Sequence, residues 1–411
     1  MPSPRTVIER GRAMAGWRVA MKAVAVAVLA PAVALALAPG DAAAKPFVPD
    51  RDTLVLEQLP EKGDASLARL KRLRAALRAN PRDLAIAVPV ARQALEAARE
   101  FGDPRFLGQA QAALAPWWSG DDVPHAALLL RATVKQSRHD FDGALADLSR
   151  LIAAQPDLAQ ARLTRATVLA VRGRYAEALD DCARLAPRVP AIVVAGCEAA
   201  PASLSGRAVP AYAALVRALE RADGDPILRG WALTLAAEIA ARLGDAAAAE
   251  RFFRDARATD ARDAYLKAAY ADFLLDQGRP QDVVPLLAAE TKNDALLLRL
   301  ALAEQRLPDR RDAFATHRSD LAARFDAARR RGDALHLREE ARFRLTLVGD
   351  AEGALRLARD NWAVQREPAD LRILLDAARA TRDAAALRVA ADWVAANRLE
   401  DVTVVMPQAR R

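Results

Sequence analysis

Residues 161–190 read ARLTRATVLAVRGRYAEALDDCARLAPRVP, and this stretch decides the fold. Apolar residues recur every three to four positions on either side of Gly173, which is the spacing of an amphipathic helix. Gly173 stands where the chain must reverse, and Pro187 and Pro190 stand where a second helix must stop. The stretch therefore predicts two antiparallel helices joined by a short turn.

The same unit returns along the chain at a fixed offset of about 34 residues. Gly173-Arg174-Tyr175 follows His139-Asp140-Phe141 at this offset, and Gly278 follows Gly244. Four units match well, namely 125–158, 159–192, 230–263 and 264–297. Looser units are expected at 193–229 and 335–368 and a last helix pair near 369–396, whereas segments 64–118 and 298–334 look helical but off-period. Such a period predicts a stack of helix pairs, because one pair alone cannot bury its apolar face.

The composition agrees with a chain built from helices alone. Of the 411 residues, 53% are hydrophobic but only 5% are aromatic, and about one residue in four is alanine. Alanine loses no side-chain entropy in a helix, whereas strands favour β-branched and aromatic residues. We therefore expect an all-α protein.

The repeat resembles the tetratricopeptide repeat (TPR). The resemblance rests on small residues in both helices, the turn glycine, the aromatic residue after it and the closing proline: Ala132, Ala166, Ala237, Ala271, Gly173, Gly244, Gly278, Phe141, Tyr175, Ala144, Ala178, Ala249, Pro156 and Pro190. It implies a right-handed superhelical α-solenoid of antiparallel helix pairs. It also implies a concave groove, lined by the first helix of each pair, that binds a protein or peptide partner.

The inward-facing positions of such a groove give the candidate site. They are Gln136, Gln160, Thr167, Trp231, Thr234, Glu238, Arg242, Tyr265, Asp272 and Asp276. The function expected from the resemblance is a non-catalytic protein-interaction module of the bacterial cell envelope. Two alternatives stay open: a membrane-anchored structural scaffold of an envelope assembly, and an enzyme subunit whose chemistry lies in the off-period segments.

The amino terminus has the three-part layout of a secretory signal. Residues 1–22 are basic, residues 23–38 read AVAVAVLAPAVALALA, and Pro39-Gly40 precedes three alanines that end at Ala44. The apolar run is shorter than the roughly 20 residues that a membrane span needs. We expect cleavage near Ala44 and a periplasmic chain without a stable membrane span, the alternative being that the leader is retained as an anchor.

These features divide the chain into four parts. We expect a signal peptide at 1–44, an N-terminal helical segment at 45–120 that is a degenerate repeat or cap, TPR-like repeats at 121–297, and degenerate repeats with a C-terminal cap at 298–411.

The charges and motifs argue against nucleic-acid binding and against catalysis. The net charge of +8 comes from arginines scattered among acidic residues, not from a basic stripe. The four histidines lack ligand spacing, and no phosphate-binding, dinucleotide-binding or hydrolase motif occurs in the sequence. We therefore expect no cofactor, no metal site and no catalytic residue.

Cys182 and Cys197, the two cysteines, lie on either side of the turn that contains Pro187 and Pro190. In an antiparallel helix pair around that turn, the two residues sit at equal heights. A disulfide is therefore plausible in an oxidising compartment, the alternative being two buried thiols.

Overall fold

The computed structural model describes residues 51, 65–120, 122–186, 188–222, 224–330 and 337–404. Within these ranges the protein is all-α, with no strand. The expected signal peptide and its cleavage site near Ala44 lie outside the described residues.

The helices alternate with short turns along the whole described chain. They are α2 (Ala65–Ala79), α3 (Leu84–Phe101), α4 (Arg105–Ala113), α5 (His125–Ser137), α6 (Phe141–Ala154), α7 (Ala159–Val171), α8 (Tyr175–Ala183), α9 (Ala191–Ala202), α10 (Ala208–Glu220), α11 (Pro226–Arg242), α12 (Ala246–Thr259), α13 (Ala264–Asp276), α14 (Pro280–Leu287), α15 (Asp294–Glu304), α16 (Arg311–Arg330), α17 (Leu337–Phe343), α18 (Ala351–Val364), α19 (Pro368–Thr381) and α20 (Ala384–Asn397). A five-residue π-helical turn, η4 (Arg344–Val348), extends α17.

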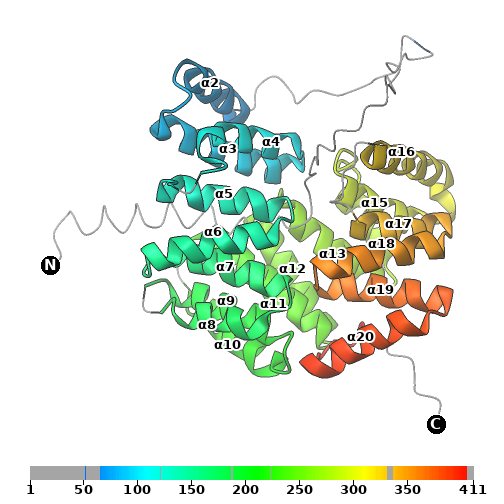
Figure 1. Ribbon diagram of the computed structural model, residues 1–411. Coiled ribbons are helices and arrows are strands. Elements are labelled where there is room, and N and C mark those ends of the chain that lie inside the picture. The colour runs from blue at the N-terminus through cyan, green and yellow to red at the C-terminus, as the bar shows by residue number, and fades with distance from the viewer. Residues whose placement is uncertain are drawn as a thin grey trace.

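Consecutive helices pack as antiparallel pairs, and the pairs stack into a solenoid (Figure 1). From α3 onward each odd-numbered helix contacts its even-numbered partner and also the next odd-numbered helix. The odd-numbered helices therefore form one continuous inner layer. The predicted fold class, an all-α solenoid of helix pairs, is confirmed.

The turns inside the pairs use the residues that the repeat pattern singles out. Gly173, Gly244 and Gly278 have φ angles of +74°, +85° and +69°, in the left-handed region that glycine enters without steric cost. His139 occupies the same place in the first repeat with φ +58°. The next helix then starts on a side-chain cap where the sequence offers one, as where Asp245 accepts a hydrogen bond from the Ala248 amide.

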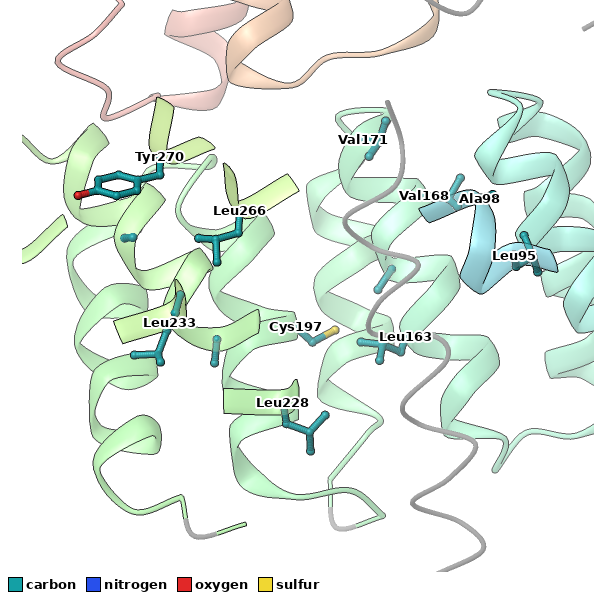
Figure 2. Close-up of a cluster of buried hydrophobic side chains, with 14 of the residues drawn as sticks. Leu95, Ala98, Leu163, Val168, Val171, Cys197, Leu228, Leu233, Leu266 and Tyr270 are labelled. Atoms are coloured by element: carbon teal, nitrogen blue, oxygen red, sulfur yellow. The ribbon is translucent and has the colours of Figure 1, made fainter. Parts of the chain in front are cut away.

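The small residues of the repeat lie where helices touch. Ala132, Ala166, Ala237 and Ala271 are all buried. Larger apolar side chains from α3, α7, α11 and α13 fill the space around such positions, as Figure 2 shows for Leu163, Leu233 and Leu266. One hydrophobic cluster runs from α2 to η4, and a second, separate cluster holds α17 to α20 together.

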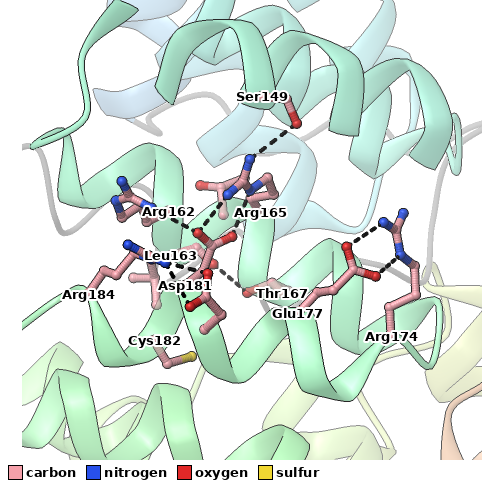
Figure 3. A network of polar contacts seen from close by, with 12 residues as sticks. Ser149, Arg162, Leu163, Arg165, Thr167, Arg174, Glu177, Asp181, Cys182 and Arg184 are labelled. Carbon is pink, nitrogen blue, oxygen red and sulfur yellow. Dashed lines mark hydrogen bonds and ion pairs between the residues drawn. The ribbon is translucent and has the colours of Figure 1, made fainter. Parts of the chain in front are cut away.

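Two repeats contain the same ion pair between their helices, in each case to a buried aspartate. Arg165 of α7 donates from Nε and Nη2 to the carboxylate of Asp181 on α8, at 2.6 and 2.8 Å (Figure 3). One repeat earlier, Arg131 Nε donates to Asp147 at 2.8 Å in the same way. Arg131 and Arg165, and likewise Asp147 and Asp181, are 34 positions apart, so the ion pair repeats with the period of the helix pairs.

The second cluster, α17–α20, folds back onto the middle of the solenoid. The Arg366 amide donates to the Val171 carbonyl at 2.8 Å, and the Val402 amide donates to the Arg242 carbonyl at 2.9 Å. The turns α7–α8, α9–α10 and α11–α12 each have a glycine that packs against α20 or the segment after it. The contacts are Gly173 with Trp393, Gly206 with Arg398 and Gly244 with Val402. The C-terminal helices therefore cover part of the concave face that the inner helices form.

The predicted bridge between Cys182 and Cys197 is present. It joins α8 to α9 across the turn, with a Cα–Cα distance of 5.5 Å, and both residues are buried. Within the described part of the chain it ties two neighbouring repeats together covalently.

Reduction of this bridge is expected to lower the free energy of unfolding by about 3 kcal/mol, because the unfolded chain regains the entropy of a loop of this size. Thermal unfolding with and without dithiothreitol measures the effect. The double variant Cys182→Ala/Cys197→Ala is the control, and its melting temperature should not respond to the reductant. Equal stability of oxidised and reduced wild-type protein contradicts the prediction.

Candidate functional site

A cavity of about 390 Å³ lies along the inner layer of helices. It is lined by residues of α3, α7, α9, α11, α12, α13, α15, α17 and α19 and by the segment after α20. Its volume falls within the range of about 300–1,000 Å³ that is usual for ligand sites. The inner helices form most of this space, and residues of α17, α19 and the segment after α20 line its other side.

One wall of the cavity is apolar and comes from α7, α9 and the first half of α11. Leu163, Ala166 and Ala170 of α7 face it, together with Ala200 of α9. The Trp231 ring packs so closely over Gly196 that a β-carbon at position 196 would overlap it. The glycine therefore lets the largest side chain of this wall lie flat against α9.

The opposite wall, from α13, α15, α17 and α19, has charged side chains that are paired with one another. The Asp272 carboxylate accepts hydrogen bonds from Arg299 Nε at 2.9 Å and from Arg342 Nη1 at 2.7 Å. Burial alone would raise the pKa of Asp272, but the two guanidinium groups hold it at about 2. Asp276 forms a two-pronged pair with Arg372 of α19, with both N–O distances at 2.7 Å. These pairs connect the middle of the solenoid to its C-terminal helices.

Glu238 of α11 stands between the two walls. Its carboxylate accepts a hydrogen bond from the Tyr265 hydroxyl of α13 at 2.7 Å. Burial raises the pKa of Glu238, because desolvation disfavours the charged form more strongly than Arg242 favours it. Burial and the nearby carboxylate likewise raise the pKa of Tyr265, so that its hydroxyl stays a donor.

The structure brings together most, but not all, of the predicted groove residues. Eight of them line the cavity: Thr167, Trp231, Thr234, Glu238, Arg242, Tyr265, Asp272 and Asp276. Gln136 and Gln160 do not line it. Gln136 is buried in α5, and the Gln160 amide donates to the Thr164 hydroxyl one turn along α7.

Sequence reasoning missed the residues that reach the cavity from the later helices. Arg299, Arg338, Glu367 and Arg372 all line it. Arg372 meets Asp276 across 96 positions of the chain. The helical period can find inward-facing positions within each repeat, but it does not show which repeats the solenoid brings face to face.

No group of three or more histidine, cysteine, aspartate or glutamate side chains in the described ranges could hold a metal ion. In the same ranges, no helix combines the length and the apolar character that crossing a membrane requires.

Comparison with known proteins gives structural neighbours only. No family model and no curated protein matches the chain. Among solved structures, a tetratricopeptide repeat protein from Parabacteroides merdae is 16% identical, with a TM-score of 0.45, covering 58% of this chain and 92% of its own. Yeast Tom70 is 12% identical, with a TM-score of 0.36, covering 81% of this chain and 89% of its own. The structure of the human IFIT1 dimer with m7Gppp-AAAA is 12% identical, with a TM-score of 0.39, covering 81% of this chain and 83% of its own.

The assignment of the fold rests on the molecule itself, because these TM-scores are low. Antiparallel pairs recur at the 34-residue offset, with left-handed glycines in their turns and alanines at their contacts. The chain is a TPR-like helical-repeat protein. In this repeat protein the last helices, α17 to α20, pack against the middle repeats and cover part of the concave face of the inner helices.

Proposed function

We propose that this repeat protein is a non-catalytic binding module that holds a segment of a partner protein in the cavity of its inner layer. The observation that carries the proposal is the division of the cavity into an apolar wall on α7 and α9 and a polar wall on α13 to α19. An amphipathic peptide segment matches both walls, because its apolar side chains can leave water while its backbone and polar groups keep hydrogen-bond partners.

We place this activity in the bacterial periplasm. The leader pattern of residues 1–44 supports export, and the Cys182–Cys197 bridge suits an oxidising compartment. Amino-terminal sequencing of the protein from the cell envelope tests the placement, since cleavage near Ala44 gives a chain that starts at Lys45.

Site-specific photocrosslinking in the source organism tests the binding site. A photoreactive phenylalanine analogue at Leu204, which lines the cavity on the α9 side, is expected to give a covalent adduct with a partner protein. The additional substitution Ala200→Leu fills part of the cavity and should abolish the adduct.

The matched control is Ala153→Leu, which adds the same side chain to the exposed side of α6 and should leave the adduct intact. An adduct that persists in the Ala200→Leu variant shows that the partner binds elsewhere on the surface.

A further inference from the structure

Glu238 differs from Asp272, Asp276 and Glu367, three other carboxylates of the cavity, in having no cation at ion-pair distance in the described structure. Asp272, Asp276 and Glu367 are each paired with at least one arginine, at 2.6 to 2.9 Å. Within the described ranges, the contact of Glu238 at hydrogen-bond distance is the neutral hydroxyl of Tyr265. Burial removes part of the hydration of this carboxylate while the nearest arginine, Arg242, makes no ion pair with it in the described structure, which is costly.

Arg242, one turn along α11, does not fill this role. Its Nη2 donates to the Ser203 hydroxyl of α9 at 3.0 Å, and its Nε has no hydrogen-bond partner in the described structure. Its backbone carbonyl receives the Val402 amide, so that the end of α11 is tied to the segment after α20. The guanidinium is therefore directed towards α9 and away from an ion pair with Glu238.

The surroundings of Glu238 suit a cation that carries an apolar stem. Glu238 keeps part of its surface free on the cavity side, and the aromatic ring of Trp231 lies on the same face of α11. Aromatic faces attract ammonium and guanidinium groups, and the aliphatic stems of lysine and arginine pack well on apolar walls. Burial raises the pKa of Glu238 because it disfavours the charged carboxylate. A bound cation would stabilise the charged form and so lower the pKa again.

We propose that the cavity recognises a lysine or arginine side chain of the partner segment, which forms an ion pair with Glu238 while flanking apolar residues lie against α7 and α9. This inference rests on the proposed function and adds to it the chemistry of the bound residue. It predicts selectivity for one cationic position inside an apolar sequence.

A defined peptide mixture tests the selectivity. The probes are acetylated, amidated pentapeptides with a central residue X flanked on each side by two residues drawn from alanine, leucine, valine and phenylalanine. X is lysine, arginine, norleucine or glutamate. The full mature protein is immobilised, and the retained peptides are quantified by mass spectrometry.

Wild-type protein is expected to retain lysine and arginine peptides at least about tenfold better than norleucine peptides, since a charge-assisted hydrogen bond is worth more than a neutral contact. Glu238→Gln should remove this preference. The amide oxygen of glutamine can still accept the Tyr265 hydrogen bond, so the fold should persist, which circular dichroism verifies. Glu352→Gln, an equal change of charge at an exposed position of α18, is the control and should keep the preference.

The outcomes separate the two proposals. Equal retention of lysine and norleucine peptides by wild-type protein, with loss of both in Ala200→Leu, overturns the role of Glu238 and leaves the peptide site standing. The peptide site is overturned if wild-type protein retains no peptide, or if Ala200→Leu retains the peptides as well as wild-type protein does. The inference about Glu238 then fails with it. A preference that survives in Glu238→Gln assigns the cation to another carboxylate and contradicts the inference.

Discussion

Replacement of Arg338 by methionine is expected to lower the free energy of unfolding by about 3–5 kcal/mol, because it leaves the buried Asp370 and the partly exposed Glu367 without a counter-charge. Arg338 Nη2 donates to Glu367 Oε2 at 2.6 Å, and its Nε lies 2.8 Å from Asp370 Oδ1. The side chain of Asp370 is fully buried. Asn361 and the Glu367 amide also donate to Asp370, but neither brings a positive charge.

The loss of stability in Arg338→Met should depend on pH, whereas a loss caused by poorer packing should not. Burial raises the pKa of Asp370 to about 6, against the attraction of Arg338. A carboxyl group whose pKa is higher in the folded than in the unfolded state binds a proton on folding, so the folded state gains stability as the pH falls through that interval. Without Arg338 the rise in pKa is larger, and the deficit of the variant should therefore shrink between pH 7 and pH 5.

Chemical unfolding at the two pH values measures this effect. The double variant Arg338→Met/Asp370→Asn is the control, since it removes one of the two orphaned charges and should recover part of the stability at pH 7. A deficit of the same size at pH 5 and pH 7 contradicts the assignment to charge.

The local architecture could be predicted from the sequence because each helix pair is specified within about 34 residues. The turn at Gly173, the alanine at the helix contact and the aromatic at Tyr175 all act on neighbours in the same or the next unit. The cysteine bridge was predictable for the same reason, since its two ends lie in adjacent repeats.

The closure of the solenoid could not be predicted in this way. It depends on small rotations between repeats that add up over several units, and no single residue encodes them. The groove prediction therefore identified Asp272 and Asp276 as inward-facing but treated them as available to a partner. In the structure both are engaged by arginines from later repeats, Arg342 and Arg372.

The substitution Gly173→Ala tests the closure itself. It is expected to lower the free energy of unfolding by about 2–5 kcal/mol, because it adds left-handed backbone strain and a steric overlap. A β-carbon at position 173 would overlap the Trp393 ring of α20. Trp393 is held in place by edge-on contacts with Tyr175 and Trp362, at ring-centroid distances of 6.1 and 5.4 Å. It cannot move aside without leaving the aromatic cluster that joins α8, α18 and α20.

Gly278→Ala is the matched control, because position 278 has nearly the same backbone angle, φ +69° against +74°, but no atom within 4 Å of the added methyl group. This variant should lower the free energy of unfolding only by the left-handed backbone strain, about 1–2 kcal/mol. The difference between the two variants therefore isolates the contact of α20 with the α7–α8 turn. Hydrogen exchange should show faster exchange of the Arg366 and Val402 amides in Gly173→Ala alone, since both donate across the closure. Equal costs for the two glycines, with unchanged exchange at these amides, would mean that the docked α20 does not hold the solenoid closed.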